Sequence, residues 1–99
     1  MKQGAWGGCW VKEIDGVECI RIVMPNSFLI LLKAKKGYVM CGYLNMETAE
    51  KLGDIACIVR GITTVEEALN AKIVSVSAKA REVGIKEGMV AREVLNLMK

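Results

Sequence analysis

Residues 37–53, with the sequence GYVMCGYLNMETAEKLG, contain the point at which the chain changes from strand to helix. The segment Tyr38–Tyr43 is mostly apolar and is bounded by turn residues, which predicts a strand. Asn45 is a preferred N-cap residue, Glu47 suits the positive end of a helix, and Gly53 is typical of the position just after a helix. The stretch therefore predicts a strand followed at once by a short helix.

Upstream of this stretch the pattern is that of β-hairpins. Trp10–Ile14 and Val17–Met24 are rich in strand-forming residues, and Asp15-Gly16 between them is a strong two-residue turn signal. Ser27–Ala34 contains a continuous apolar run, which is typical of a central strand. The loop Lys35-Lys36-Gly37 then leads into Tyr38–Tyr43, so we expect an antiparallel meander.

The Asp15-Gly16 turn also predicts the pairing of the first two strands. It places Ile14 opposite Val17 and Trp10 opposite Arg21. Side chains alternate along a strand, so each strand has two faces. We expect the core face to carry three apolar residues, namely Val11, Ile20 and Ile22.

Downstream, short strands alternate with short helices. We expect strands over Ile55–Val59 and Ile73–Val76, and helices that begin after Thr64, after Ser77 and near Val90. Such β-α-β crossovers normally place their strands parallel. The fold class predicted is α/β (mixed α+β): an N-terminal antiparallel β-meander followed by β-α-β crossovers and two C-terminal helices on a mixed sheet. A chain of 99 residues forms one domain over 1–99, and the glycines among residues 1–8 predict fraying there.

The composition indicates self-association. Hydrophobic residues make up 53% of the chain, and the mean hydropathy is +0.30. A domain this small leaves much of its surface exposed, so we expect an apolar patch that a homo-oligomer would cover. The alternative is a monomer with an unusually apolar surface. The sequence shows neither a membrane span nor a secretory signal, and the expected location is the cytoplasm.

Charge and cysteine content disfavour several functional classes. The net charge is only +3, and the basic run of Lys33, Lys35 and Lys36 has no interleaved aromatic residues, so the sequence disfavours nucleic-acid binding. The chain has 4 cysteines, no CxxC motif and no histidine, which leaves zinc without support and predicts no cofactor. Without a secretory signal we expect reduced thiols.

Three segments carry a family resemblance. Residues 37–44, Val59-Arg60-Gly61-Ile62 and residues 83–89 are similar to blocks of the YunC-like family, domain-of-unknown-function family 1805. The resemblance extends from about Ile14 onward, and it departs from the family pattern at Val90-Ala91, where relatives are expected to have a glycine. It implies the fold and no particular activity.

If the last three strands are parallel, their carboxyl ends share one edge of the sheet, where α/β proteins usually bind ligands. Three helix N-termini and the charge of Arg60 would then form an anion site for a carboxylate or phosphate. The alternative is that the cap residues only cap helices, the glycines only form turns, and Arg60 pairs with a surface carboxylate. The predicted ligand-binding residues are Gly42, Tyr43, Asn45, Arg60, Gly61, Thr63, Thr64 and Ser77.

Cys41 is the candidate catalytic residue. A thiol at a strand end near an arginine could act as a nucleophile, although the chain has no histidine to activate it, and a buried structural Cys41 is the favoured interpretation. The leading functional hypothesis is therefore a small oligomeric module that binds an anionic metabolite or a protein partner. The alternative is a cysteine-dependent enzyme or redox protein that uses Cys41.

Overall fold

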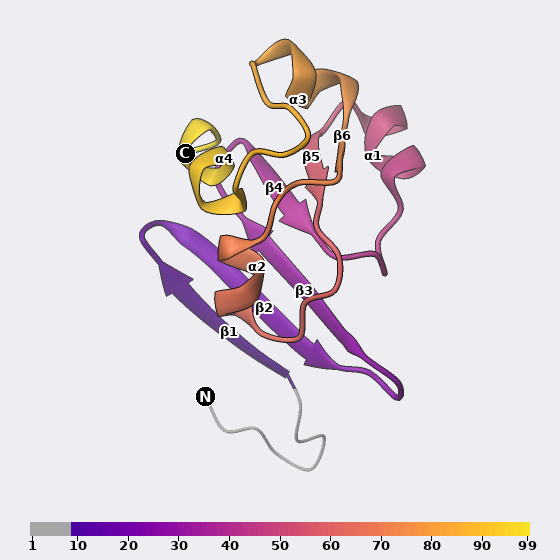
Figure 1. Ribbon diagram of the computed structural model, residues 1–99, viewed down its shortest axis with the longest axis vertical. Coiled ribbons are helices and arrows are strands. Elements are labelled where there is room, and N and C mark those ends of the chain that lie inside the picture. Colours follow the sequence, from indigo (N-terminus) through magenta and orange to yellow (C-terminus); the bar gives the residue numbers. More distant parts are fainter. Residues whose placement is uncertain (1–8) are drawn as a thin grey trace.

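The computed structural model describes residues 9–99, which build one six-stranded sheet in the order β1-β2-β3-β4-β5-β6 (Figure 1). The strands are β1 (Cys9–Ile14), β2 (Val17–Val23), β3 (Phe28–Lys33), β4 (Gly37–Met40), β5 (Ile55–Ile58) and β6 (Ser75–Val76). The helices are α1 (Met46–Leu52), α2 (Val65–Asn70), α3 (Ala78–Glu82) and α4 (Ala91–Leu97). The mixed α+β fold class is confirmed. The predicted fraying of residues 1–8 concerns a segment outside the described residues.

The register of the first hairpin is as predicted. Ile14 pairs with Val17 and Trp10 with Arg21. Asp15 and Gly16 both have positive φ, at 51° and 83°, which is the conformation of the tight turn that suits the twist of two antiparallel strands. Asp15 tolerates this conformation better than most residues because its short polar side chain can bond locally.

The predicted core face of this hairpin was wrong. Val17 and Cys19 are buried, whereas Val11 is 55% exposed and Ile20 and Ile22 are only partly buried. β2 carries apolar side chains on both of its faces, so alternation could not identify the covered one. The choice is made by the helices, which pack on the face that carries Val17 and Cys19.

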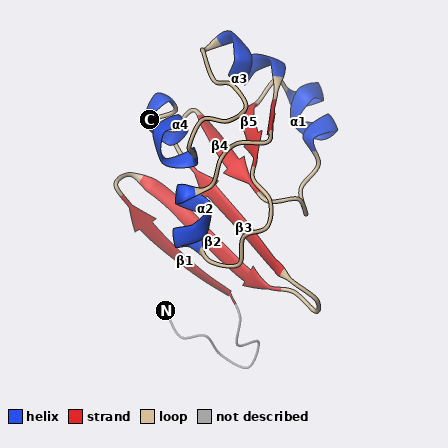
Figure 2. Ribbon diagram, in the orientation of Figure 1, coloured by secondary structure: helices blue, strands red, loops and turns tan. Residues whose placement is uncertain are grey.

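The helices lie on the two faces of the sheet unequally (Figures 1 and 2). Buried residues of α2, α3 and α4 join one large core cluster with alternate residues of the sheet, including Ile30 and Cys57. On the opposite face, Ala49 of α1 packs with Ala56 and Ile58 in a smaller cluster beside β4 and β5. Within residues 9–99, no helix lies over the β1–β3 part of that second face. No helix within residues 9–99 combines the length and the apolar character that a membrane crossing requires.

The three predicted side-chain caps are present. Asn45 accepts hydrogen bonds from the backbone N–H of Glu47 and Thr48 at the start of α1. Thr64 caps α2 and Ser77 caps α3 in the same way. Ser77 follows β6 directly, whereas residues 41–44 separate Asn45 from β4 and residues 59–63 separate Thr64 from β5.

One strand direction differs from the prediction. β4 and β5 are parallel, as expected for a crossover through α1, but β6 is antiparallel to β5. After β5 the chain crosses to the β2–β3 region, where α2 packs, and β6 then runs back from that level (Figure 1). The connection over residues 59–74 is long enough for a parallel crossover, so its length does not decide the direction. Because α2 packs over β2 and β3, the chain returns to the sheet at the end of β5, where Ser75 pairs with Ile58.

Candidate functional site

A cleft of about 340 Å³ opens where β4 and β5 end. It brings together Cys41, Gly42 and Tyr43, which follow β4, with Arg60 and Gly61, which follow β5. We call it the Arg60 cleft. Five of the predicted site residues thus lie around one cavity, at the sheet edge where the sequence placed them. The complete lining is Ser27, Phe28, Cys41, Gly42, Tyr43, Arg60, Gly61 and Ile62.

The parallel pairing of β4 and β5 positions Arg60. The N–H of Val59 donates to the carbonyl of Met40 at 2.9 Å, so the residue after Val59 lies beside the segment that follows β4. A Cβ atom on Gly42 would lie 3.0 Å from Nη1 of Arg60. The guanidinium therefore passes closely over the backbone of Gly42, and the missing side chain there makes room for it.

The Arg60 guanidinium is exposed at the cleft and makes no hydrogen bond or ion pair with any other residue of the described part of the chain. The other arginines differ. Arg81 pairs with Glu87 at 2.7 Å, Arg92 lies 3.7 Å from Glu66, and Arg21 donates from Nε to the carbonyl of Thr63 at 2.9 Å. Arg60 is thus the one arginine of residues 9–99 that has no hydrogen-bond or ion-pair partner within those residues.

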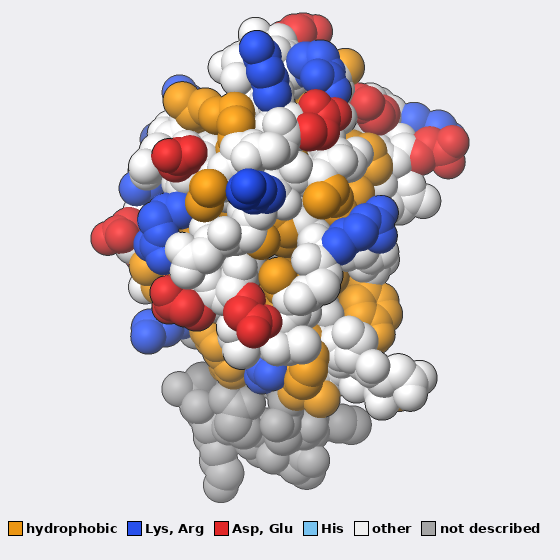
Figure 3. Space-filling view, viewed as in Figure 1, with side chains coloured by type: hydrophobic (Ala, Val, Ile, Leu, Met, Phe, Trp, Pro, Cys, Tyr) orange, Lys and Arg blue, Asp and Glu red, His pale blue; other side chains and the backbone are white. Residues whose placement is uncertain are grey.

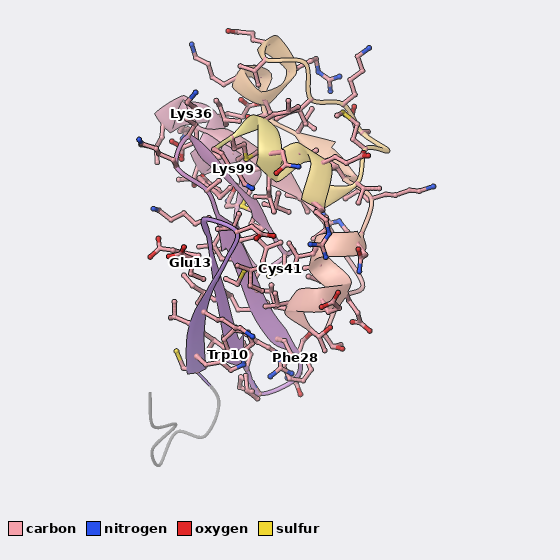
Figure 4. All side chains as sticks on the ribbon, turned by 90° about the vertical axis from the view of Figure 1, so that its left-hand side faces the viewer. Trp10, Glu13, Phe28, Lys36, Cys41 and Lys99 are labelled. Atoms are coloured by element: carbon pink, nitrogen blue, oxygen red, sulfur yellow. The ribbon has the colours of Figure 1, made fainter. Side chains whose placement is uncertain are left out.

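Cys41 is held in the wall of the cleft by the sheet. Its Sγ accepts a hydrogen bond from the N–H of Ile30 at 3.3 Å, and its own N–H donates to the carbonyl of Ile30 at 3.1 Å. The side chain is only 5% exposed. In Figure 4 Cys41 lies nearer the middle of the molecule than Phe28, which is near the lower end of the strands. Cys41 therefore extends the pairing of β3 and β4 as well as lining the cavity.

The remaining walls are mostly apolar. Phe28 is partly buried, Ile62 is buried, and Tyr43 is 46% exposed at the opening. The guanidinium of Arg21 lies over the ring of Phe28, 4.2 Å from its centroid, which is a cation–π geometry. Arg21 therefore helps to fix the Phe28 ring without itself lining the cleft.

The other predicted residues lie outside the cleft. Thr63 donates from its backbone N–H and its hydroxyl to Oε1 of Glu67, at 2.7 and 3.0 Å, and Thr64 caps α2. The hydrogen bonds from Thr63, followed by one from Thr64, lower the pKa of Glu67. Asn45 caps α1 and borders a second groove. The polar side chains of Asn45, Thr63 and Thr64 are thus already hydrogen-bonded within the chain. For Asn45 and Thr64 this agrees with the alternative interpretation that they only cap helices.

Ser77 lies at the other end of β5, which corrects its predicted position. Its hydroxyl donates to the carbonyl of Asp54 at 2.7 Å and accepts from the N–H of Ala56 at 3.0 Å, next to the beginning of β5. It is fully buried. Because β6 runs antiparallel, its carboxyl end and the start of α3 are carried away from the Arg60 cleft. Three helix N-termini therefore do not converge at one edge.

Three lining residues were not predicted: Ser27, Phe28 and Ile62. Phe28 begins β3, which pairs with β4, and Ser27 precedes it. The antiparallel register of Leu31 with Met40 brings both beside the residues that follow β4. Counting that register from the Lys35-Lys36-Gly37 loop would have placed them there. The apolar character of Phe28 suggested only core.

A second groove, of about 540 Å³, lies between α1 and strands β3 and β4 on the other face of the sheet. Tyr43 borders both cavities. The groove is lined by Leu31, Lys33, Tyr38, Met40, Tyr43, Leu44, Asn45, Thr48 and Ala49. Its polar groups are largely paired, since Lys33 bonds Glu18 and the hydroxyl of Tyr38 donates to Oδ2 of Asp54 at 2.6 Å. Nowhere in residues 9–99 do three or more metal-ligating side chains group together.

Sequence and structure comparisons agree on the class of protein. Residues 40–98 match the family model described as "Domain of unknown function (DUF1805)". The chain belongs to this family, so the resemblance inferred from residues 37–44 is confirmed, although the model match begins at Met40, well after Ile14.

Two relatives extend the comparison. The uncharacterized protein YunC of Bacillus subtilis (strain 168) is 32% identical over 80 residues, which cover 77% of this chain and 79% of YunC. The crystal structure of a protein of unknown function from Thermoplasma acidophilum is similar with a TM-score of 0.83 and 42% identity, covering 92% of this chain and 91% of the other. Both descriptions leave the function open, so the argument for function rests on the Arg60 cleft.

Proposed function

We propose that this protein is an oligomeric module that binds a small anion in the Arg60 cleft. One observation carries the proposal: the guanidinium of Arg60 lies across Gly42 at a 340 Å³ cavity and has no partner within residues 9–99. A guanidinium presents several N–H donors in a planar fork that fits oxyanions. The anion would supply the acceptors that Glu87 and Glu66 supply to Arg81 and Arg92.

The oligomer would cover the part of the sheet that has no helix over it. We call this surface, formed by the outward side chains of β1–β3, the uncovered face. Its apolar residues are Val11, Ile20, Ile22 and Leu29, and Leu31 lies at its border with the cluster beneath α1. A contiguous apolar surface of this kind usually marks an interface. Charged side chains border it, with Lys33 and Glu18 paired at 3.4 Å. On the opposite, helix-bearing side, acidic and basic side chains are interspersed (Figure 3).

The competing hypothesis is a cysteine-dependent reaction at Cys41. Its support is that Cys41 lines the same cavity as Arg60. A nucleophilic thiol needs a neighbouring base, and the lining contains no carboxylate, histidine or lysine. The Sγ atom is moreover engaged as an acceptor from Ile30. Binding is therefore the better supported function.

Backbone NMR tests the anion site. In ¹H–¹⁵N spectra, sodium acetate and sodium phosphate are titrated separately at constant ionic strength, with chloride as the reference salt. We expect at least one of the two anions to shift the amide signals of Gly42, Tyr43 and Gly61, and Arg60→Gln to weaken that response at least tenfold. Lys86→Gln is the matched control because Lys86 is exposed and lies outside the cleft lining. Equal responses in the two variants would contradict the proposal.

Sedimentation tests the oligomer separately. At micromolar concentration we expect the mass of two or more chains of 10.8 kDa each. Ile20→Glu places a charge in the uncovered face and should lower the mass to that of one chain. Leu97→Glu is the control because Leu97 is 51% exposed on α4, which packs on the opposite face of the sheet. A single-chain mass for the unmodified protein would refute the oligomer while leaving the anion site untouched.

A further inference from the structure

We propose that the Arg60 cleft, if it binds anions as argued above, selects small monocarboxylates with a flat apolar body, such as one-ring aromatic acids, over phosphorylated ligands. The inference rests on the proposed function and adds the chemical class of the ligand. Three features of the cavity carry it: its charge, the state of the neighbouring helix terminus and the composition of its walls.

The charge of the lining matches a monoanion. Among the described residues, Arg60 is the only one in the lining with a formal charge. A carboxylate carries one negative charge on two coplanar oxygens, which a single guanidinium can engage through two parallel N–H donors. A phosphate monoester carries close to two charges at neutral pH and three acceptor oxygens, so one guanidinium leaves it incompletely paired.

The neighbouring helix cannot serve as a phosphate cradle. Phosphate sites commonly use free N–H groups at a helix N-terminus. Here the N–H of Glu67 donates to the Thr64 hydroxyl at 3.0 Å, and the N–H of Thr63 donates to the Glu67 carboxylate at 2.7 Å. The first turn of α2 also carries Glu66 and Glu67. Two N–H groups at this terminus are thus occupied within the chain, and the two carboxylates repel a multiply charged ligand.

The walls indicate the body of the ligand. Phe28 and Ile62 form apolar surface, and Tyr43 adds a second aromatic ring at the opening. Arg21, stacked over Phe28 and bonded to Thr63, limits the movement of that ring. A volume of about 340 Å³ is near the lower end of the roughly 300–1,000 Å³ typical of ligand sites. Such a cavity fits one ring and its acidic group.

A matched set of four probes tests the inference by the NMR titration described above: phenylacetate, acetate, phenylacetamide and phenyl phosphate. We expect phenylacetate to bind at least tenfold more tightly than acetate because of the ring. It should also bind at least tenfold more tightly than phenylacetamide because of the charge, and at least threefold more tightly than phenyl phosphate. Arg60→Gln should lower phenylacetate affinity at least tenfold. Phe28→Leu should lower phenylacetate affinity several-fold while leaving that of acetate within twofold, with the dispersion of the spectrum confirming that the variant is folded.

The outcomes separate this inference from the proposed function. Tighter, Arg60-dependent binding of phenyl phosphate would overturn the carboxylate preference and leave the anion site standing. Equal affinities for acetate and phenylacetate would overturn the aromatic body alone. No Arg60-dependent response to any of the anionic probes would overturn both the inference and the proposed function.

Discussion

The two ends of β5 differ in how their polar groups are used. At its beginning, the hydroxyl of buried Ser77 bonds Asp54, Ala56 and Ala80. At its end, Arg60 extends its guanidinium over Gly42 and bonds nothing in the described part of the chain. We call these the closed end and the open end. Both were expected to belong to one ligand site, and the antiparallel course of β6 separates them.

The difference shows which of the predicted site residues act in folding. A buried hydroxyl with three partners contributes to stability, because its removal leaves backbone groups unpaired. An exposed cation without a partner contributes little to stability and remains available to a ligand. The closed end should therefore respond to mutation in stability and the open end in binding. Four predictions examine this division, beginning with the largest expected effect.

Cysteine labelling probes the interior between the two ends. Burial, with a smaller contribution from Glu87, raises the pKa of Cys57 to about 12. Near pH 8 its thiolate is then on the order of a thousandfold scarcer than that of an ordinary thiol, so iodoacetamide should label it that much more slowly in the native protein than in urea. Half-buried Cys9 should be labelled fastest, and Cys41 more slowly than Cys9. Peptide mass spectrometry over pH 6–9 measures each rate. Labelling of Cys41 ahead of Cys9 at pH 6 would favour the cysteine-dependent alternative.

Removal of the Ser77 hydroxyl should destabilise the closed end. Ser77→Ala leaves the Asp54 carbonyl and the Ala56 N–H without their partner, and we expect a loss of about 2–3 kcal/mol in the free energy of unfolding. Thr64→Ala removes an exposed cap and should cost about 1 kcal/mol. Urea unfolding of the two variants compares them, and anion binding should survive in Ser77→Ala. Equal losses would mean that the buried position of Ser77 adds nothing to its role as a cap.

The two glycines of the open end should respond differently to alanine. Gly61 has a φ of 72° and no atom near a new Cβ, so Gly61→Ala should cost about 1–2 kcal/mol of stability through backbone strain. Gly42→Ala instead places its Cβ 3.0 Å from Nη1 of Arg60. It should change stability by less than about 0.5 kcal/mol and weaken the binding of the NMR probe anion several-fold. Unaltered anion affinity in Gly42→Ala would show that the position of Arg60 over Gly42 is not needed.

Alkaline pH should weaken the closed end slightly. Burial, together with the hydrogen bond to Asp54 and its charge, raises the pKa of Tyr38 to about 12, against about 10 in the unfolded chain. The native state thus holds this proton more tightly, so the stability that it contributes is complete below about pH 10 and is lost as the pH rises toward 12. The decline of unfolding free energy over this interval should be shallower in Tyr38→Phe. Equally steep declines of the unfolding free energy in Tyr38→Phe and in the unmodified protein would contradict the raised pKa of Tyr38.

Local sequence signals predicted much of the fold. The Asp15-Gly16 turn was sufficient for the register of the first hairpin, and Asn45, Thr64 and Ser77 marked the helix starts, because turns and caps depend on residues close in sequence. The covered face of that hairpin and the direction of β6 depend on helices distant along the chain. They could not be obtained from local pattern.

The candidate site also contains residues that the local sequence predicted and residues that it misplaced or missed. Gly42 and Arg60 were predicted from strand ends, and the parallel pairing of β4 and β5 brings them together. Ser77 was misplaced with β6. Phe28 was missed because an aromatic residue that opens a strand has the same local signature whether it lines a cleft or fills a core.

The antiparallel course of β6 has a consequence for motion within the native state. Ile58 ends β5 opposite Ser75, which begins β6, so the intervening residues leave the sheet and return to it at one point. A segment whose two ends meet can open as one unit while the rest of the sheet stays folded. The base of that segment contains Arg60 and Gly61, and its far part contains α2. A ligand at the base would oppose this opening, and deuterium would then enter the amides of α2 more slowly although the ligand touches none of them.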